Sequence, residues 1–283
     1  MFKNHRYLYL TILCFVVLDV LIWRLVLFPE RHKDLELYFL DVGQGDSQLI
    51  LSDGVKVLID GGRPNGQALS ALAEILPATD RYLDLVVMTH PQLDHYGGLI
   101  EVAKNYQIGV FLNNGHQGEY AAYFDLEKIL KEKNITTITL GEGDRIKYRD
   151  AVLSVLNPSP RTLKSKDLND TSVVLMLEKG GLKALYTGDI GAETEQELAK
   201  KYDLDAHILK VSHHGSRFSS DIGFLKEVSP VMATIGVGKN SYGHPTPQTL
   251  ARLASIGSTV ARTDKEGTIK VIYDGLNLKI YRL

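Results

Sequence analysis

A long apolar segment near the start of the chain constrains folding most, because it divides the sequence into two unlike parts. Residues 7–28 read YLYLTILCFVVLDVLIWRLVLF, and 20 of these 22 residues carry no charge. About 20 apolar residues suffice for a helix that crosses a bilayer. A buried core helix is the alternative, but this segment is apolar all round and not on one face. We therefore expect a membrane anchor with a short linker over residues 1–34, followed by one domain over residues 35–283.

The charges around this segment favour one orientation. Lys3 and Arg6 precede it, which favours a cytoplasmic N-terminus and places the domain outside the cytoplasm. Asp19 lies mid-span, at a cost of roughly 2.5–3.5 kcal/mol if central, and Arg24 can extend towards the far interface. No cleavage site with small residues follows, so we expect a retained anchor, not a removed signal peptide. The expected protein is single-pass, with an extracytoplasmic domain.

Composition excludes several kinds of site in the remaining chain. A single cysteine, Cys14, excludes intrachain disulfides and Cys-rich zinc sites. Residues 35–283 carry a net charge of −4, whereas proteins that bind nucleic acid through bulk charge are strongly basic. A polyanion would therefore have to be bound through a local patch or a metal ion.

The domain alternates between strand-like and helix-like segments. Short apolar segments bounded by Gly, Asp and Pro predict strands, and one-sided apolar segments predict helices. Strands are expected at 36–42, 46–51, 55–60, 85–89, 108–112, 135–140, 152–156, 172–178, 182–187, 206–211, 231–236, 258–262, 268–273 and 276–282, and helices at 66–78, 97–106, 120–133, 191–201, 220–228 and 246–256. This pattern predicts a mixed α/β (α+β) fold with two packed sheets and helices outside them.

Histidines and aspartates follow several of the predicted strands. Five of the nine histidines lie at strand ends, together with two aspartates: His90, Asp94, His95, Asp189, His213, His214 and His244. Imidazole and carboxylate groups are suitable ligands for Zn²⁺ or Mn²⁺. Any one of these histidines is readily explained as an ordinary surface or core residue. Their recurrence at strand ends predicts a metal site.

Several of these segments, in this order, resemble the metallo-β-lactamase-fold hydrolases, and among them the soluble hydrolase domain of the ComEC/Rec2 competence proteins. The matching segments are LDVGQGDS at 40–47, LIDGG at 58–62, the turn at 90–98, TGD at 187–189, HHGS at 213–216, GHP at 243–245 and TDKEGTI at 263–269. The resemblance implies an αββα sandwich with a metal site at one edge of its sheets.

The resemblance also implies roles for individual residues. It places His90 at a first metal ion, Asp94 and His95 at a second, and Asp189 as a bridging carboxylate. The late histidine ligand is His213 or His214, and we favour His213 because it lies nearer its strand. The implied cofactor is one or two divalent ions, Zn²⁺ or Mn²⁺.

Two departures from the family pattern concern the first metal. Gln92 stands where the broad family has His and the competence branch often has Asp; the amide is either a weak ligand or a group that hydrogen-bonds to a ligand. A histidine that many relatives carry before the bridging Asp has no clear counterpart, and the segment containing Asn169 lies there instead. One strong metal site, or two unequal ones, is therefore expected.

Further polar residues are candidates at the edge of the site. Asp41 and Asp46 either belong to a tight Gly-rich turn or orient ligands and water, and Asp60 is expected to support the turn at His90. Ser216, Lys210 and His244 are candidate substrate contacts, although the lysine charge could equally be a solvated surface group.

This chemistry favours hydrolysis. A divalent ion acidifies water and polarises the bond to be broken, and Asp94 or Asp189 can accept the proton. We expect a phosphodiesterase or nuclease, possibly acting on single-stranded DNA, as the competence resemblance implies. The alternatives are a metal-poor binding or scaffold protein that retains the fold, and a lactonase or β-lactamase-like acyl hydrolase. The sequence indicates no protein partner.

Overall fold

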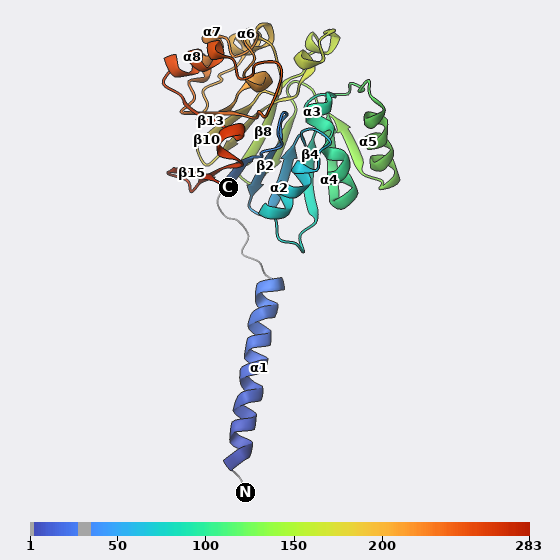
Figure 1. The fold of residues 1–283 in the computed structure, drawn as a ribbon, viewed down its shortest axis with the longest axis vertical. Coiled ribbons are helices and arrows are strands. Elements are labelled where there is room, and N and C mark those ends of the chain that lie inside the picture. The colour runs from blue at the N-terminus through green and yellow to red at the C-terminus, as the bar shows by residue number, and fades with distance from the viewer. Residues whose placement is uncertain (1–2, 28–34) are drawn as a thin grey trace.

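A computed structural model describes residues 3–27 and 35–283. Helix α1 (Lys3–Leu27) extends away from the folded domain (Figure 1). Its span from Tyr7 to Arg24 is exposed, and by length and composition it could cross a membrane or serve as a signal sequence. Most of the expected linker, residues 28–34, lies outside the described residues.

The first of two sheets has eight strands, half of them in parallel pairing. Its order is β15 (Leu278–Arg282), β14 (Ile269–Tyr273), β1 (Leu35–Phe39), β2 (Gln48–Ser52), β3 (Val55–Ile59), β4 (Tyr82–Val87), β5 (Gln107–Asn113) and β6 (Thr136–Thr139). Neighbours from β15 to β3 are antiparallel, and those from β3 to β6 are parallel.

The second sheet has seven strands and is likewise divided into a parallel part and an antiparallel part. Its order is β13 (Thr259–Arg262), β12 (Met232–Ile235), β11 (Ile208–Lys210), β10 (Leu182–Tyr186), β9 (Val174–Lys179), β8 (Ala151–Asn157) and β7 (Arg145–Tyr148). Strands β10 to β13 are parallel, and β10 to β7 are antiparallel.

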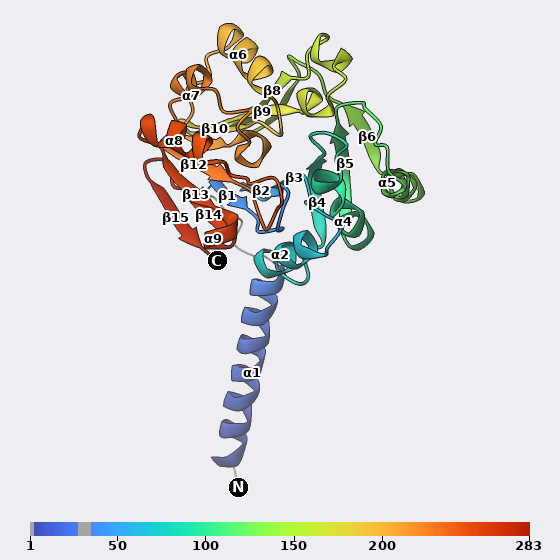
Figure 2. The same cartoon turned by 45° about the horizontal axis from the view of Figure 1, so that its top comes forward.

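Helices cover the outer face of each sheet. Helices α2 (Gln67–Ile75), α4 (Leu99–Asn105) and α5 (Ala121–Glu132) pack on the first sheet, and α6 (Ala192–Lys201), α7 (Ile222–Val228) and α8 (Pro247–Ser255) on the second. Figure 2 shows these two groups on opposite sides of the domain. A third apolar cluster, which includes Leu37, Ile59 and Leu175, lies between the sheets. These layers confirm the predicted αββα sandwich.

The structure differs from the predicted elements in a few places. The helix expected at 97–106 is α4, which begins after Gly97 and Gly98, and the short helix α3 (Leu93–Tyr96) before these glycines was not predicted. Strand β7 was not predicted, because its sequence RIKY is mostly exposed and has no apolar run. The short helix α9 (Thr263–Glu266) was likewise not predicted.

The parallel halves of the two sheets position the site. Parallel strands end at the same edge of a sheet, so the loops after them converge there. Asp60 follows β3, the turn at residues 90–95 follows β4, Asp189 follows β10, and the segment Ser212–Gly215 follows β11. Histidines and aspartates that are far apart in the sequence therefore meet at one edge of the sandwich.

Candidate metal centre

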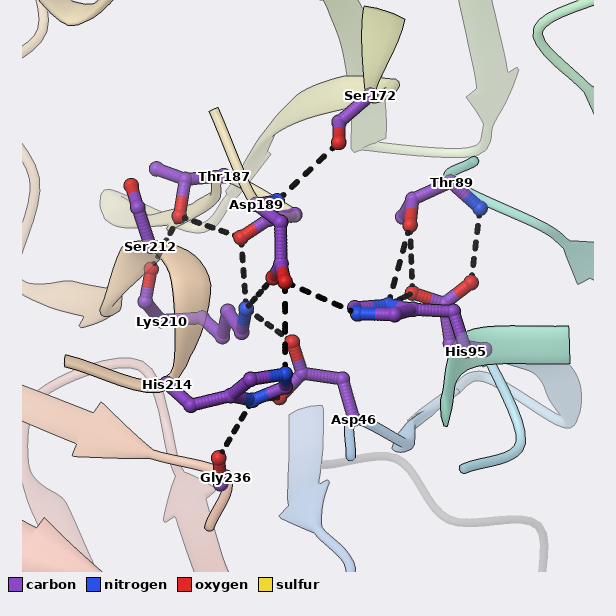
Figure 3. Close-up of polar contacts among 12 residues, drawn as sticks. Asp46, Thr89, His95, Ser172, Thr187, Asp189, Lys210, Ser212, His214 and Gly236 are labelled. Atoms are coloured by element: carbon purple, nitrogen blue, oxygen red, sulfur yellow. Dashed lines mark hydrogen bonds and ion pairs between the residues drawn. The ribbon is translucent and has the colours of Figure 1, made fainter. Parts of the chain in front are cut away.

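Four buried side chains meet at this edge: Asp46, His95, Asp189 and His214. One nitrogen or carboxylate oxygen of each lies within 4.8 Å of those of the others. The four come from separate loops of both sheets and point towards one another (Figure 3). Asp94 borders the same cluster, with Oδ2 3.6 Å from Nε2 of His214.

The orientation of His95 is set by Asp60. Nδ1 of His95 lies 2.8 Å from Oδ2 of Asp60. Asp60 also accepts hydrogen bonds from the backbone N–H (2.8 Å) and the hydroxyl (2.7 Å) of Thr89. This leaves Nε2 of His95 buried and without a hydrogen-bond partner among the described residues, 3.3 Å from Oδ2 of Asp189. A carboxylate behind a histidine is the usual support of a metal ligand.

His214 is held in a matching way by a backbone carbonyl. Its Nδ1–H donates to the carbonyl of Gly236 at 2.8 Å, and its Nε2 lies 3.4 Å from Oδ2 of Asp189. His213 and His214 both have left-handed backbone conformations, with φ of 50° and 52°, and the turn directs His214 into the cluster. The ring of His213 instead packs against His244, with centroids 5.6 Å apart. The structure thus places His214, and not the favoured His213, beside Asp189.

His90 presents a third unpartnered ring nitrogen. Its Nδ1 lies 3.0 Å from the hydroxyl of Thr89, while Nε2 is buried with no hydrogen-bond partner in the described part of the chain. Its ring centroid lies 4.1 Å from that of His95. Burial, and then the neighbouring His95, lower the pKa of His90 to about 3, so its ring is neutral and can donate a lone pair.

The carboxylates dominate the electrostatic field inside the cluster. Although burial opposes ionisation, His214 and His95 lower the pKa of Asp189 well below its ordinary value. Burial likewise disfavours charge on His214, but Asp189 and Asp46 raise its pKa to about 10. Protons and divalent cations compete for the same nitrogens and oxygens. Buried nitrogen and oxygen donors in a negative electrostatic field, with three Nε2 atoms that have no hydrogen-bond partner within residues 3–27 and 35–283, therefore fit a divalent metal ion.

Lys210 lies inside this cluster and not at a surface. Its Nζ donates to the carbonyl of Gly188 at 2.7 Å, lies 3.4 Å from Oδ1 of Asp189, and forms an ion pair with Asp46. Burial alone would lower the pKa of Lys210, but Asp46 and Asp189 raise it above its ordinary value. With its side chain 1% exposed, Lys210 is not the solvated surface group that the sequence allowed, and its role as a substrate contact stays a prediction.

A pocket of about 780 Å³ opens onto the cluster. Asp94, Asp189, Gln92, His213, His214 and His244 line it. Its walls also include Arg63, Tyr120 and Tyr242, and the two tyrosines are 59% and 66% exposed. Sequence reasoning did not single out these three as site residues, because nothing in their local pattern marks them. Arg63 directly follows the LIDGG segment and Tyr242 directly precedes the GHP segment, and these two adjacencies were the available signals.

The remaining candidates have mainly local contacts. Oδ1 of Asp41 accepts a hydrogen bond from the N–H of Gly43 at 3.1 Å, as in a tight turn. Ser216 is buried, and its hydroxyl accepts from the N–H of Phe218 at 3.3 Å. Asn169 has a buried side-chain oxygen with no hydrogen-bond partner in the described ranges 3–27 and 35–283. Burial, and next His213, lower the pKa of His244 to about 4.

Close backbone approach explains Gly45, the second glycine of the LDVGQGDS segment. The N–H of Asp46 donates to the carbonyl of Asp94 at 3.2 Å. A Cβ on Gly45 would lie 2.3 Å from that carbonyl oxygen. Gly45 thus lets the loop that carries Asp46 pack directly on the turn that carries Asp94.

With this fold and this cluster, the chain belongs to the metallo-beta-lactamase superfamily, whose sequence profile matches residues 40–222. The fold is similar to that of YhfI, a metallo-beta-lactamase fold protein from Bacillus subtilis. The TM-score is 0.58 at 12% identity, and the match covers 84% of this chain and 100% of YhfI.

Among curated proteins, the chain is similar to ComE operon protein 3 of Bacillus subtilis, at 30% identity over 88% of this chain and 34% of that protein. It is also similar to the competence protein ComA of Neisseria gonorrhoeae, at 30% identity over 86% of this chain and 32% of ComA. The chain thus spans about a third of the length of these relatives. The expected family and competence-protein resemblance are confirmed.

Proposed function

We propose that residues 35–283 form a metal-dependent phosphodiesterase or nuclease. The observation that carries this proposal is the convergence of buried Nε2 atoms that have no hydrogen-bond partner among the described residues, two of them beside Asp189. The residues that would bind the ion are Asp94, His95, Asp189 and His214, with His90 and Gln92 beside them. Their nitrogen and carboxylate donors suit Zn²⁺ or Mn²⁺.

Asp94 and Asp189 would have different tasks. A bound divalent ion supplies Lewis-acid activation of both water and the scissile bond. The side chain of Asp94 is 23% exposed and lines the pocket, whereas that of Asp189 is 2% exposed and faces two histidines. Both carboxylates line the pocket, but Asp94 is the more exposed, so Asp94 would exchange protons with solvent at the reacting bond while Asp189 would orient the ligand set.

Three observations favour a phosphodiester in nucleic acid as substrate. Arg63 can pair with phosphate, and Tyr120 and Tyr242 offer exposed aromatic faces on which bases can stack. One of the relatives that the chain resembles is named a competence protein, which supports a role connected with DNA. The fold is also that of a diphosphatase from the PhnP family, with a TM-score of 0.51 at 14% identity.

The proposed arrangement in the cell is a single-pass anchor with the domain outside the cytoplasm. Helix α1 has the length and composition of a membrane span, and the Lys3 and Arg6 charges favour a cytoplasmic N-terminus. Residues 1–34 would be the anchor and linker, and residues 35–283 the hydrolase domain.

The full chain in detergent tests the proposed activity. With Mn²⁺ or Zn²⁺ it should cleave single-stranded DNA, and both a chelator and Asp94→Asn should abolish cleavage. Asp274→Asn, in the distant turn before β15, is the matched control and should remain active. Cleavage that survives both the chelator and Asp94→Asn would refute the proposal. Hydrolysis of lactones without cleavage of diesters would indicate an acyl hydrolase. Failure of the chain to retain metal would indicate a scaffold protein.

A further inference from the structure

Lys210 is a buried cation at the centre of a site that should itself attract cations. Its Nζ is surrounded by three oxygens: the carbonyl of Gly188, Oδ2 of Asp46 and Oδ1 of Asp189. Figure 3 shows Lys210 beside the two aspartates. Burying an ammonium group is costly unless such partners compensate it. All-oxygen surroundings are also what a hard metal ion such as Mn²⁺ prefers. Lys210 thus occupies a position with the chemistry of a cation site.

Lys210 distinguishes the two oxygens of Asp189. Oδ1 faces the ammonium group at 3.4 Å. Oδ2 faces Nε2 of His95 at 3.3 Å and Nε2 of His214 at 3.4 Å. The lysine therefore leaves one oxygen of this carboxylate available on the side of the histidines.

The charges of the other carboxylates can be assigned in the same way. Asp46 is paired with Lys210. Asp60 is committed to His95 and Thr89. Asp94 and Asp189 remain beside histidine Nε2 atoms that have no hydrogen-bond partner in the described part of the chain, and their two negative charges balance one divalent ion. A second divalent ion would find no further uncompensated carboxylate in this cluster.

From this arrangement we infer that Lys210 is a positioning residue that takes the place of a second cation, so that the centre binds one divalent ion. The inference rests on the metal-binding part of the proposed function. A purely structural ion pair between Lys210 and Asp46 is the alternative, and it predicts that the number of bound ions does not depend on Lys210.

Metal stoichiometry separates these possibilities without any substrate. The full chain in detergent is titrated with Mn²⁺, free Mn²⁺ is counted from its electron paramagnetic resonance signal, and bound metal is measured after dialysis. We expect one ion per chain for the wild type. Lys210→Ala vacates the position of Nζ and frees Asp46 and Oδ1 of Asp189, so it should bind two. The double variant Lys210→Ala with Asp46→Asn also removes the negative charge of Asp46, so it should again bind one ion per chain.

Two results would overturn the inference. The first is that the wild-type chain binds two ions. The second is that the Lys210→Ala variant folds, binds the same number of ions as the wild type, and has a Kd for Mn²⁺ within about threefold of the wild-type value. If Lys210→Ala does not fold by near-ultraviolet circular dichroism, the uncharged pair Lys210→Met with Asp46→Asn replaces it. That pair should fold and bind one ion, and two ions or none would contradict the inference. A chain that binds one ion but cleaves no diester would refute the proposed function alone.

Discussion

The carboxylate of Asp60 lies 2.8 Å from Nδ1 of His95 and fixes which ring nitrogen of that histidine faces the candidate metal centre. Asp60 itself adopts a left-handed backbone conformation, with φ of 58°. Its two oxygens are also held by the N–H and hydroxyl of Thr89. The orientation of a ligand in the turn after β4 thus depends on a residue at the end of β3.

Replacing Asp60 should weaken metal binding without removing a ligand. In Asp60→Asn the amide cannot support His95 as a carboxylate does, so affinity for Mn²⁺ or Zn²⁺ should fall about 10- to 100-fold. Competition with a fluorescent chelator measures the change. Asp84→Asn, which alters a carboxylate that accepts from the N–H of Lys56 away from the centre, should leave affinity unchanged. Equal affinities in all three proteins would show that Asp60 does not orient His95.

Gly98 should be intolerant of even a methyl group. A Cβ at this position would lie 2.0 Å from the carbonyl oxygen of Gly61, although its backbone, with φ of −73°, is one that alanine adopts readily. The penalty for Gly98→Ala is therefore steric, and we expect a loss of about 3 kcal/mol in the free energy of unfolding. At Gly141 the nearest atom to an added Cβ is 4.0 Å away, so Gly141→Ala should be nearly neutral. Urea denaturation of both variants checks this, and similar midpoints would contradict it.

Glu195 should make the domain less stable as the pH rises. This buried carboxyl group accepts hydrogen bonds from the N–H groups of Ser220 and Asp221 at 2.7 and 2.9 Å. Burial nonetheless raises its pKa from 4.5 to about 7. Between these two values the folded state binds more protons than the unfolded state, so stability falls with rising pH, by about 3 kcal/mol in all.

The variant Glu195→Gln isolates this effect, since it has no group to titrate. The difference in unfolding free energy between wild type and variant should change between pH 4.5 and pH 7 and be constant outside that range. Subtracting the variant removes the contributions of all other titratable groups, because these groups are common to both proteins. A difference that does not vary with pH would show that folding leaves the pKa of Glu195 unchanged.

The exposed tyrosines of the pocket should bind bases. Tyr120→Ala and Tyr242→Ala should each weaken binding of a short single-stranded oligonucleotide about 5- to 100-fold, in line with the loss of one stacked base. Fluorescence anisotropy measures this, and an abasic oligonucleotide should bind both variants as it binds the wild type. Phe124→Ala is the control, because Phe124 is also exposed but is not among the residues that line the pocket. If all three variants bind alike, the pocket does not use its aromatic side chains.

The sequence predicted the layers of the fold and the convergence of strand-end residues, because both depend on local patterns of apolar and polar residues. It did not distinguish His213 from His214, since the choice depends on two left-handed residues in succession. Lys210 was misjudged for another reason. Its partners Asp46 and Asp189 lie far away in the sequence, so its burial arises only when the two sheets pack. Arg63 and Tyr120 were missed because a pocket wall carries no local signature.

The candidate ligands are divided between the two sheets. Asp94 and His95 follow β4 of the first sheet, whereas Asp189 and His214 follow β10 and β11 of the second. A bound ion would act as a cross-link between two layers that are otherwise joined mainly by apolar packing. The concentration of available metal would then affect the folding stability of the domain as well as its proposed activity. At an ion concentration 100-fold above Kd, the gain in folding stability would be about 2.7 kcal/mol, so a shortage of metal would expose the domain to unfolding.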